Sequence, residues 1–141
     1  MPSDALLKTM NTIHRTLFRA SGGRLLGKVA GMPVVDLETK GRKSGRPRRS
    51  MLTSPVQDGD KIVLVASRGG DPHHPAWYHN LKANPDVEIT MAGKRKPMRA
   101  RVATPEEKSE LWPKVVARYK GYGQYQTKTT RDIPLVILEP R

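Results

Sequence analysis

The chain has 141 residues, of which 26 are lysine or arginine and 13 are aspartate or glutamate, so its formal net charge at pH 7 is +13. That length suits one domain with a single core, and the positive charge predicts an anionic partner: nucleic acid, anionic lipid or a polyanionic small molecule. The chain contains no cysteine, which excludes disulfides, thiolate metal sites and cysteine nucleophiles. Nothing in the sequence points to an oxidising compartment, so we expect a cytoplasmic protein. No apolar run approaches the roughly 20 residues of a membrane span, so we expect it to be soluble.

An amphipathic helix is predicted over residues 4–20, because apolar residues recur every three to four positions and basic residues lie outside that stripe. The stripe consists of Leu6, Met10, Ile13 and Leu17. Such a helix either packs on the domain or forms a lid or membrane-surface helix whose basic residues meet anionic lipid. We therefore expect residues 1–30 to form a helix and linker, and residues 31–141 to form the main domain.

Strand patterns dominate from Pro33 onward. Strands are predicted at residues 34–39, 50–56, 62–66, 87–91, 98–102 and 133–138. Asp58-Gly59 and Ala92-Gly93 are signals for hairpin turns. Pro134 predicts that the last strand lies at a sheet edge or begins at this proline.

Two helices are predicted within this region. A short one over residues 76–83 follows Pro75, and a longer one begins at the capping box formed by residues 104–107. Pro113 is expected to kink the longer helix or make it restart. The glycines interleaved with tyrosines over residues 119–125 argue against a regular helix there.

This order of elements predicts an α+β protein whose sheet is mainly antiparallel. Hairpin-linked strands with few crossover helices favour such a sheet, and a short chain with one core is expected to curl it into a small barrel with flanking helices. A parallel nucleotide-binding sheet is disfavoured, because the sequence has neither a Walker loop nor a Gly-x-Gly-x-x-Gly turn after a strand.

The segment over residues 41–50 has the composition of an anion clamp. Five of its ten residues are basic, none is acidic, and Gly41 and Gly45 allow backbone N–H groups to converge on a ligand. Arginine offers a planar fork to phosphate or carboxylate, and lysine adds a point charge. The alternative is a solvated surface loop, which is the usual role of a charge run.

A second unusual stretch spans residues 65–80. Gly69 and Gly70 would let the chain wrap a ligand closely, although glycine pairs also form ordinary turns. Its three histidines show no recognised metal-ligand spacing, so no metal is expected. Because the chain also lacks a Gly-x-Ser-x-Gly elbow, a bound cofactor is expected to supply any difficult chemistry.

Three of the four tyrosines recur at every third residue: Tyr119, Tyr122 and Tyr125. Tyrosines can stack on a planar ligand and donate a hydrogen bond to a developing oxyanion. They can equally form an aromatic cover over the sheet.

Taken together, these motifs closely resemble the deazaflavin-dependent nitroreductase and quinone reductase family of mycobacteria and related actinobacteria. The match covers roughly residues 30–139 and includes the string from Asp132 to Pro134. The resemblance implies a split β-barrel related to flavin-binding split barrels, and an oxidoreductase that transfers a hydride from reduced coenzyme F420, an 8-hydroxy-5-deazaflavin, to a quinone such as menaquinone or to a nitro compound. A membrane quinone would place the enzyme at the inner face of the cell membrane.

The resemblance also implies roles for individual residues. The coenzyme's phosphate and acidic tail would be held by Lys43, Ser44, Gly45 and Arg48, with help from Arg42. The next strand would line the coenzyme with Arg49, Ser50, Met51, Leu52 and Thr53. The ring would be faced by Val65, Ala66, Ser67, Arg68 and Gly69, and closed on its other side by Ala76, Trp77, Tyr78, His79 and Asn80. The acceptor would be oriented by Tyr119, Tyr122 and Tyr125 together with Ser67, as the catalytic set.

Two other readings stay open on the residues alone. A basic barrel could bind nucleic acid, but base stacking needs exposed aromatics, and the chain has only one phenylalanine and two tryptophans. A relative of the same fold could bind flavin or haem, neither of which carries an acidic tail for the clamp.

Overall fold

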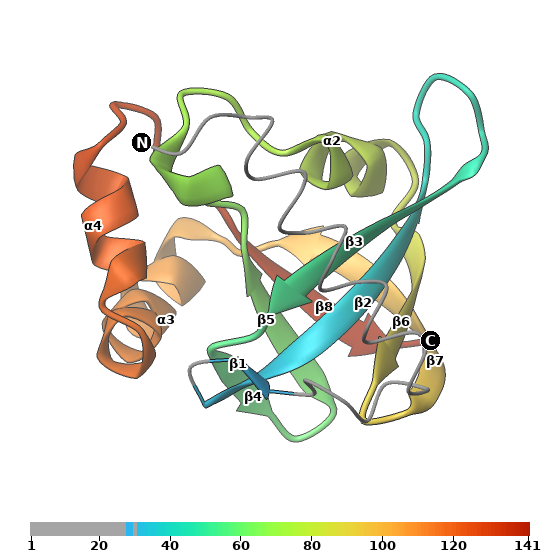
Figure 1. The fold of residues 1–141 in the computed structure, drawn as a ribbon, viewed down its shortest axis with the longest axis horizontal. Coiled ribbons are helices and arrows are strands. Elements are labelled where there is room, and N and C mark those ends of the chain that lie inside the picture. The colour runs from blue at the N-terminus through green and yellow to red at the C-terminus, as the bar shows by residue number, and fades with distance from the viewer. Residues whose placement is uncertain (1–27, 30) are drawn as a thin grey trace.

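The computed structural model describes residues 28–29 and 31–141, so the helix predicted over residues 4–20 lies outside the described part of the chain. The described strands are β1 (Lys28–Val29), β2 (Met32–Lys40), β3 (Pro47–Thr53), β4 (Val56–Asp58), β5 (Lys61–Val65), β6 (Asp86–Met91), β7 (Lys94–Val102) and β8 (Leu135–Pro140). The helices are α2 (Ala76–Ala83), α3 (Pro105–Arg118) and α4 (Gly121–Thr127), with a 3₁₀ turn, η1 (Arg68–Gly70) (Figure 1).

The described strands form one antiparallel sheet. Its order is β1-β2-β6-β7-β8-β5-β4, and β3 pairs with β2. Among these strands no pair closes the order into a complete barrel, which fits a split barrel better than a closed one. The α+β, mainly antiparallel fold is therefore confirmed. Because β8 lies between β7 and β5, Pro134 precedes an interior strand, and its missing N–H falls just outside the ladder.

Both faces of the sheet are buried, which explains the continuous apolar run over residues 62–66. Side chains alternate along a strand, so Ile62 and Leu64 join one apolar cluster with α2, while Val63 and Val65 join a second cluster with α3 and α4. In Figure 1, α2 lies above the sheet, and α3 and α4 lie together at its left. The two clusters thus fix α2 and α4 on different sides of β5.

Both predicted hairpin turns are confirmed. Asp58 pairs with Lys61 across Gly59, which has φ 59°, and Met91 pairs with Lys94 across Ala92 and Gly93. The strand predicted over residues 50–56 is instead divided into β3 and β4 at Ser54 and Pro55.

The division occurs because the chain changes partners at Ser54. Its backbone N–H donates to the Pro33 carbonyl at 3.0 Å, and its buried hydroxyl donates to the carbonyl of Val63 at 2.7 Å. Pro55, which has no N–H, cannot continue the ladder with β2. The chain then pairs with β5 instead.

Helix α3 begins at the predicted capping box. The Thr104 hydroxyl accepts from the Glu107 N–H at 3.2 Å, and the Glu107 carboxylate accepts from the Thr104 N–H at 2.9 Å. The helix continues through Pro113 rather than restarting there. The proline is exposed, and the next turn is held by the fully buried Val115, so packing outweighs the hydrogen bond that proline removes.

The expectation of irregular backbone around the tyrosines is wrong, because Gly121–Thr127 forms helix α4. A glycine within a helix costs about 1 kcal/mol relative to alanine, but here both glycines allow close packing. A side chain at Gly121 would overlap the Tyr119 ring, and one at Gly123 would lie 3.3 Å from a Val116 methyl group. Burial of Tyr122 against the sheet then offsets the cost of the glycines.

Candidate functional site

The basic segment forms the tip of the hairpin between β2 and β3. The Gly41 N–H donates to the Arg46 carbonyl at 2.8 Å, and the Gly45 N–H donates to the Gly41 carbonyl at 2.8 Å. Gly45 has φ 70°, a left-handed conformation that favours glycine. A Cβ on Gly41 would lie 2.8 Å from the Ser44 hydroxyl. Both glycines therefore shape the turn that presents the basic side chains.

Asn80 of α2 anchors this hairpin tip. Its side-chain oxygen accepts from the Arg42 N–H at 3.1 Å, and its amide nitrogen donates to the Thr39 hydroxyl at 3.2 Å. Asn80 and Thr39 are both buried, where an unpaired polar group is costly. The contact fixes the basic loop relative to α2.

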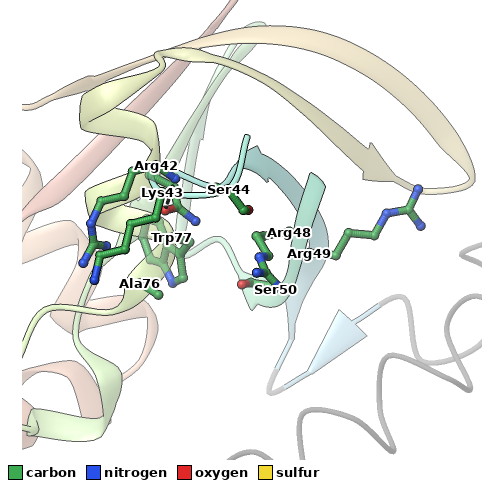
Figure 2. Close-up of a pocket in the computed structure, with 10 residues that line it drawn as sticks. Arg42, Lys43, Ser44, Arg48, Arg49, Ser50, Ala76 and Trp77 are labelled. Carbon is green, nitrogen blue, oxygen red and sulfur yellow. Dashed lines mark hydrogen bonds between the residues drawn. The ribbon is translucent and has the colours of Figure 1, made fainter. Parts of the chain in front are cut away.

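An open pocket of about 450 Å³ lies between the hairpin tip, β3 and α2. Its lining consists of Gly41, Arg42, Lys43, Ser44, Arg48, Arg49, Ser50, Ala76, Trp77 and Asn80. All but Gly41 were predicted to contact the coenzyme. Figure 2 shows the Arg42 and Lys43 side chains on the side of Trp77, and Arg48 beside Ser50 on the opposite side. Three segments that lie up to 39 residues apart thus meet at one pocket.

The charges of this pocket are poorly neutralised. Within residues 31–141, no acidic side chain forms an ion pair with Arg42, Lys43 or Arg48. Arg49 differs, because its Nε donates to Glu38 at 3.1 Å, and it points away from the other lining residues in Figure 2. Arg42, Lys43 and Arg48 are therefore the available cations.

The remaining predicted residues of the clamp and β3 lie elsewhere. Gly45 lines a smaller neighbouring pocket of about 160 Å³. Met51 is buried against Val34, and Leu52 packs on the apolar cluster beneath α2. The Thr53 hydroxyl lies 3.0 Å from the Tyr122 hydroxyl. These side chains connect the pocket strand to the core rather than line the pocket.

The segment predicted to face the coenzyme ring does not line the 450 Å³ pocket. Val65, Ala66 and Ser67 are buried, whereas Arg68 and Gly69 are half-buried. Arg68, Gly69 and Gly70 have φ angles of 45°, 66° and 83°. Three successive left-handed residues make a tight turn, and a Cβ on Gly70 would lie 2.7 Å from the Tyr125 carbonyl. Helix α4 therefore packs directly on this turn.

Two predicted residues of α2 belong to an aromatic group beside the pocket. Tyr78 is buried, with its ring centroid 4.6 Å from that of His74 and 5.7 Å from that of His79. Burial and the charges of Arg42 and Lys82 lower the pKa of His79, and burial and Arg131 lower the pKa of His74. Both environments thus favour the neutral imidazole.

The three tyrosines lie together on and before α4. The Tyr122 ring centroid is 5.2 Å from that of Tyr119 and 6.1 Å from that of Tyr125. Tyr122 is 6% exposed, and burial raises the pKa of its phenol. Burial, with a hydrogen bond that the Tyr125 phenol donates to Tyr119, raises the pKa of Tyr125 to about 12. Tyr122 and Tyr125 therefore remain protonated at neutral pH.

Two residues hold the site in place, but no pattern in the sequence predicts that role. Thr39 reads only as a strand residue, yet it completes the Asn80 anchor. Arg131 stands between Thr130 and Asp132 in what reads as a polar loop, yet its guanidinium donates to the carbonyls of Ala66 and Ser67. Contacts over such sequence separations become visible only in the folded chain.

Over residues 28–29 and 31–141, no three histidine, cysteine or acidic side chains gather so as to hold a metal ion. In the same part of the chain, no helix is both long and apolar enough to cross a membrane.

Comparison with known proteins bears on the site. Residues 10–140 match the family model of the F420H(2)-dependent quinone reductases. The chain is 41% identical over 133 residues to an F420H(2)-dependent quinone reductase of Mycobacterium tuberculosis, covering 92% of this chain and 89% of that protein.

Solved structures of similar proteins point to the same family. An F420-H2-dependent reductase, FDR-A, is 44% identical and superposes with a TM-score of 0.69 over 76% of this chain and 94% of its own. A chain described as a domain-swapped dimer is 38% identical, with a TM-score of 0.70 over 91% and 97%. The haem storage protein HutZ of Vibrio cholerae, at 24% identity and a TM-score of 0.51 over 77% and 81%, shares the fold alone.

The family model spans most of the chain, and the mycobacterial relative is 41% identical over most of both proteins. The resemblance inferred from the motifs is thereby confirmed. The chain belongs to the F420H(2)-dependent quinone reductase family, whose members are oxidoreductases that use reduced coenzyme F420.

Proposed function

We propose that this protein holds reduced F420 in the 450 Å³ pocket and passes a hydride to an electron-poor acceptor, first of all a quinone. The proposal rests on three cations around that pocket, Arg42, Lys43 and Arg48. No acidic side chain of residues 31–141 forms an ion pair with them, and the chain belongs to a family that uses F420.

The residues present fit the coenzyme. Its phosphodiester and oligoglutamate tail form a polyanion, for which exposed arginine and lysine with a serine hydroxyl are suitable partners. Gly41 leaves room for the turn to close tightly, and the Arg42 backbone is already held by Asn80. The pocket is thus organised before an anion binds, which reduces the entropy lost on binding.

The residues of this chain would have different roles in binding and in hydride transfer. Lys43, Ser44 and Arg48 bind the acidic groups, while Ala76 and Trp77 provide the wall of the pocket that α2 contributes. When bound, reduced F420 supplies a hydride from carbon, and a quinone then needs one further proton. Tyr119 and Tyr125 are half-buried, and burial raises the pKa of Tyr125, so we propose that both orient the acceptor by hydrogen bonds.

The segment from Val65 to Gly69 lies beside α4 and the tyrosines. We propose that it faces the coenzyme ring, with Ser67 near the acceptor, and that residues 31–141 form the coenzyme-binding domain. The predicted helix over residues 4–20 would act as a lid or membrane contact.

The natural acceptor would decide where the enzyme works. We propose menaquinone as the quinone and nitro compounds as further acceptors, in a protein of the cytoplasm that reaches the inner face of the membrane. Pelleting with anionic vesicles, with and without residues 1–20, tests the membrane contact. Equal pelleting of the two forms would contradict it.

Titration tests the proposed function directly. Purified protein is titrated with oxidised and reduced F420, with flavin mononucleotide and with a DNA oligonucleotide at low and high salt, followed by menadione and a nitroaromatic. We expect micromolar or tighter F420 binding and menadione reduction. Salt-sensitive DNA binding without F420 binding would favour the nucleic-acid alternative, and preference for the flavin would favour a flavin-binding relative.

A further inference from the structure

Arg131 occupies the link between α4 and β8 and reaches across to the segment over residues 66–74. Its Nη2 donates to the Ser67 carbonyl at 2.7 Å, its Nη1 to the Ala66 carbonyl at 3.1 Å, and its Nε to the Asp71 carbonyl at 2.9 Å. The same Nη1 lies 3.0 Å from Nδ1 of His74. All three guanidinium nitrogens therefore contact one short segment.

That segment needs external support. Ser67 to Asp71 contains the three successive left-handed residues. Within this turn the Gly70 N–H donates to the Ser67 carbonyl at 3.0 Å, and the Asp71 N–H donates to the Arg68 carbonyl at 3.2 Å. Left-handed conformation at Arg68, which is not glycine, is unfavourable unless its surroundings hold it. The planar fork of Arg131 supplies contacts at both ends of the turn.

Arg131 is itself fixed by α4. The Gln126 side chain donates to the Arg131 carbonyl at 2.8 Å and accepts from the Ile133 N–H at 3.0 Å. Helix α4 also carries the Tyr125 carbonyl against Gly70. One arginine thus links the segment from Ala66 to His74 with the helix that carries Tyr122 and Tyr125.

We propose that Arg131 is a positioning residue for hydride transfer: its guanidinium sets the turn from Ser67 to Asp71, and with it the distance between the coenzyme ring and the tyrosines of α4. This rests on the proposed function, because it takes that turn as the side that faces the ring. Lysine donates from one nitrogen and lacks the planar fork whose three nitrogens contact Ala66, Ser67 and Asp71.

The test compares Arg131→Lys and Arg131→Gln with Arg141→Lys. Arg141 is the matched control, because it also donates to two backbone carbonyls, of Val87 and Met98, but lines neither pocket. Without coenzyme, we expect both Arg131 variants to accelerate amide hydrogen exchange at Gly70 and Asp71 and to shift the ¹⁵N resonance of His74 Nδ1. Arg141→Lys should leave both signals unchanged.

In both Arg131 variants the clamp residues Lys43 and Arg48 are unchanged. We therefore expect the F420 affinity of these variants to change less than about threefold, well below the effect of losing a charged contact. Single-turnover hydride transfer to menadione at saturating coenzyme should slow by about 10- to 100-fold, the effect of a misplacement near 1 Å. Wild-type exchange and wild-type transfer in Arg131→Lys would overturn the proposal. Failure of the wild type itself to bind F420 would instead overturn the proposed function, while the exchange arm would still test the turn.

Discussion

The hydroxyl groups of Thr53 and Tyr122 lie 3.0 Å apart, although 69 residues separate them in the chain. Thr53 ends β3, whose first residues line the pocket, and Tyr122 belongs to α4. The Tyr122 hydroxyl also lies 4.0 Å from the Met32 sulfur. This contact joins the strand of the basic pocket to the helix of the tyrosines.

Removing the Tyr122 hydroxyl should therefore loosen α4 without touching the pocket. We expect Tyr122→Phe to lower the free energy of unfolding by about 0.5–1.5 kcal/mol, to preserve F420 binding and to slow turnover. Urea unfolding, coenzyme titration and steady-state kinetics measure the three effects. Thr53→Val and the double variant complete a cycle, in which the two losses should not add. Full additivity, or normal turnover in Tyr122→Phe, would contradict the assigned link.

The cations of the pocket should control coenzyme affinity. Lys43→Ala or Arg48→Ala should weaken F420 binding by about 10-fold or more at low salt, because each removes a charge-assisted contact to the acidic groups. The loss should shrink as salt screens the attraction. Fluorescence titration at several salt concentrations measures this, with Lys94→Ala of β7 as the control for net charge. An equal loss in Lys94→Ala would show a general charge effect instead of a specific clamp.

Asn80 should act on the pocket through the hairpin tip. Asn80→Ala leaves the buried Thr39 hydroxyl and the Arg42 N–H without their partner, so we expect a loss of about 1–3 kcal/mol in the free energy of unfolding and weaker coenzyme binding. Asn80→Asp keeps an acceptor for Arg42 and should bind coenzyme better than Asn80→Ala. Asn84→Ala, at the end of the same helix, is the control. It should change neither the free energy of unfolding nor the coenzyme affinity. Unchanged affinity in Asn80→Ala would remove the anchor role.

Acid should weaken the start of α3. The Arg101 guanidinium contacts both oxygens of Glu107 at 2.6 and 2.8 Å, and this pair with the Thr104 N–H lowers the pKa of Glu107 from 4.5 to about 2. A carboxylate with a lowered folded pKa stabilises the protein above its unfolded pKa, and this stability is lost as pH falls from about 4.5 to about 2.

Glu107→Gln should therefore reduce the urea midpoint at pH 7 and have a much smaller effect near pH 2, where about half of the wild-type carboxyl groups are protonated in the folded state. Urea unfolding at a series of pH values measures the difference between the two proteins. Glu110→Gln, on an exposed position of the same helix, is the control. A difference that stays constant from pH 7 to pH 2 would show that the charge of Glu107 is not responsible.

Much of the fold follows from local rules that the sequence displays. Alternating apolar residues specify β6 and β7, glycine in the turns specifies their hairpins, and the capping box specifies the start of α3. The bounds of α2, Ala76–Ala83, agree with the prediction, because Pro75 and Asn84 limit the helix through local backbone preferences. The cationic loop was equally visible, since its composition alone indicates an anion.

Tertiary structure decided what local preference could not. The glycines of α4 argue against a helix until burial of Tyr122 and close packing against Val116 are known. Arg49 reads as another cation of the clamp, but Glu38 from the neighbouring strand pairs with it. The roles of Thr39 and Arg131 depend on partners about 40 and 60 residues away. Sequence thus determined most of the elements and the charge of the ligand. The packing of distant segments decided the helix α4, which side chains are available to bind the ligand and which hold the site in place.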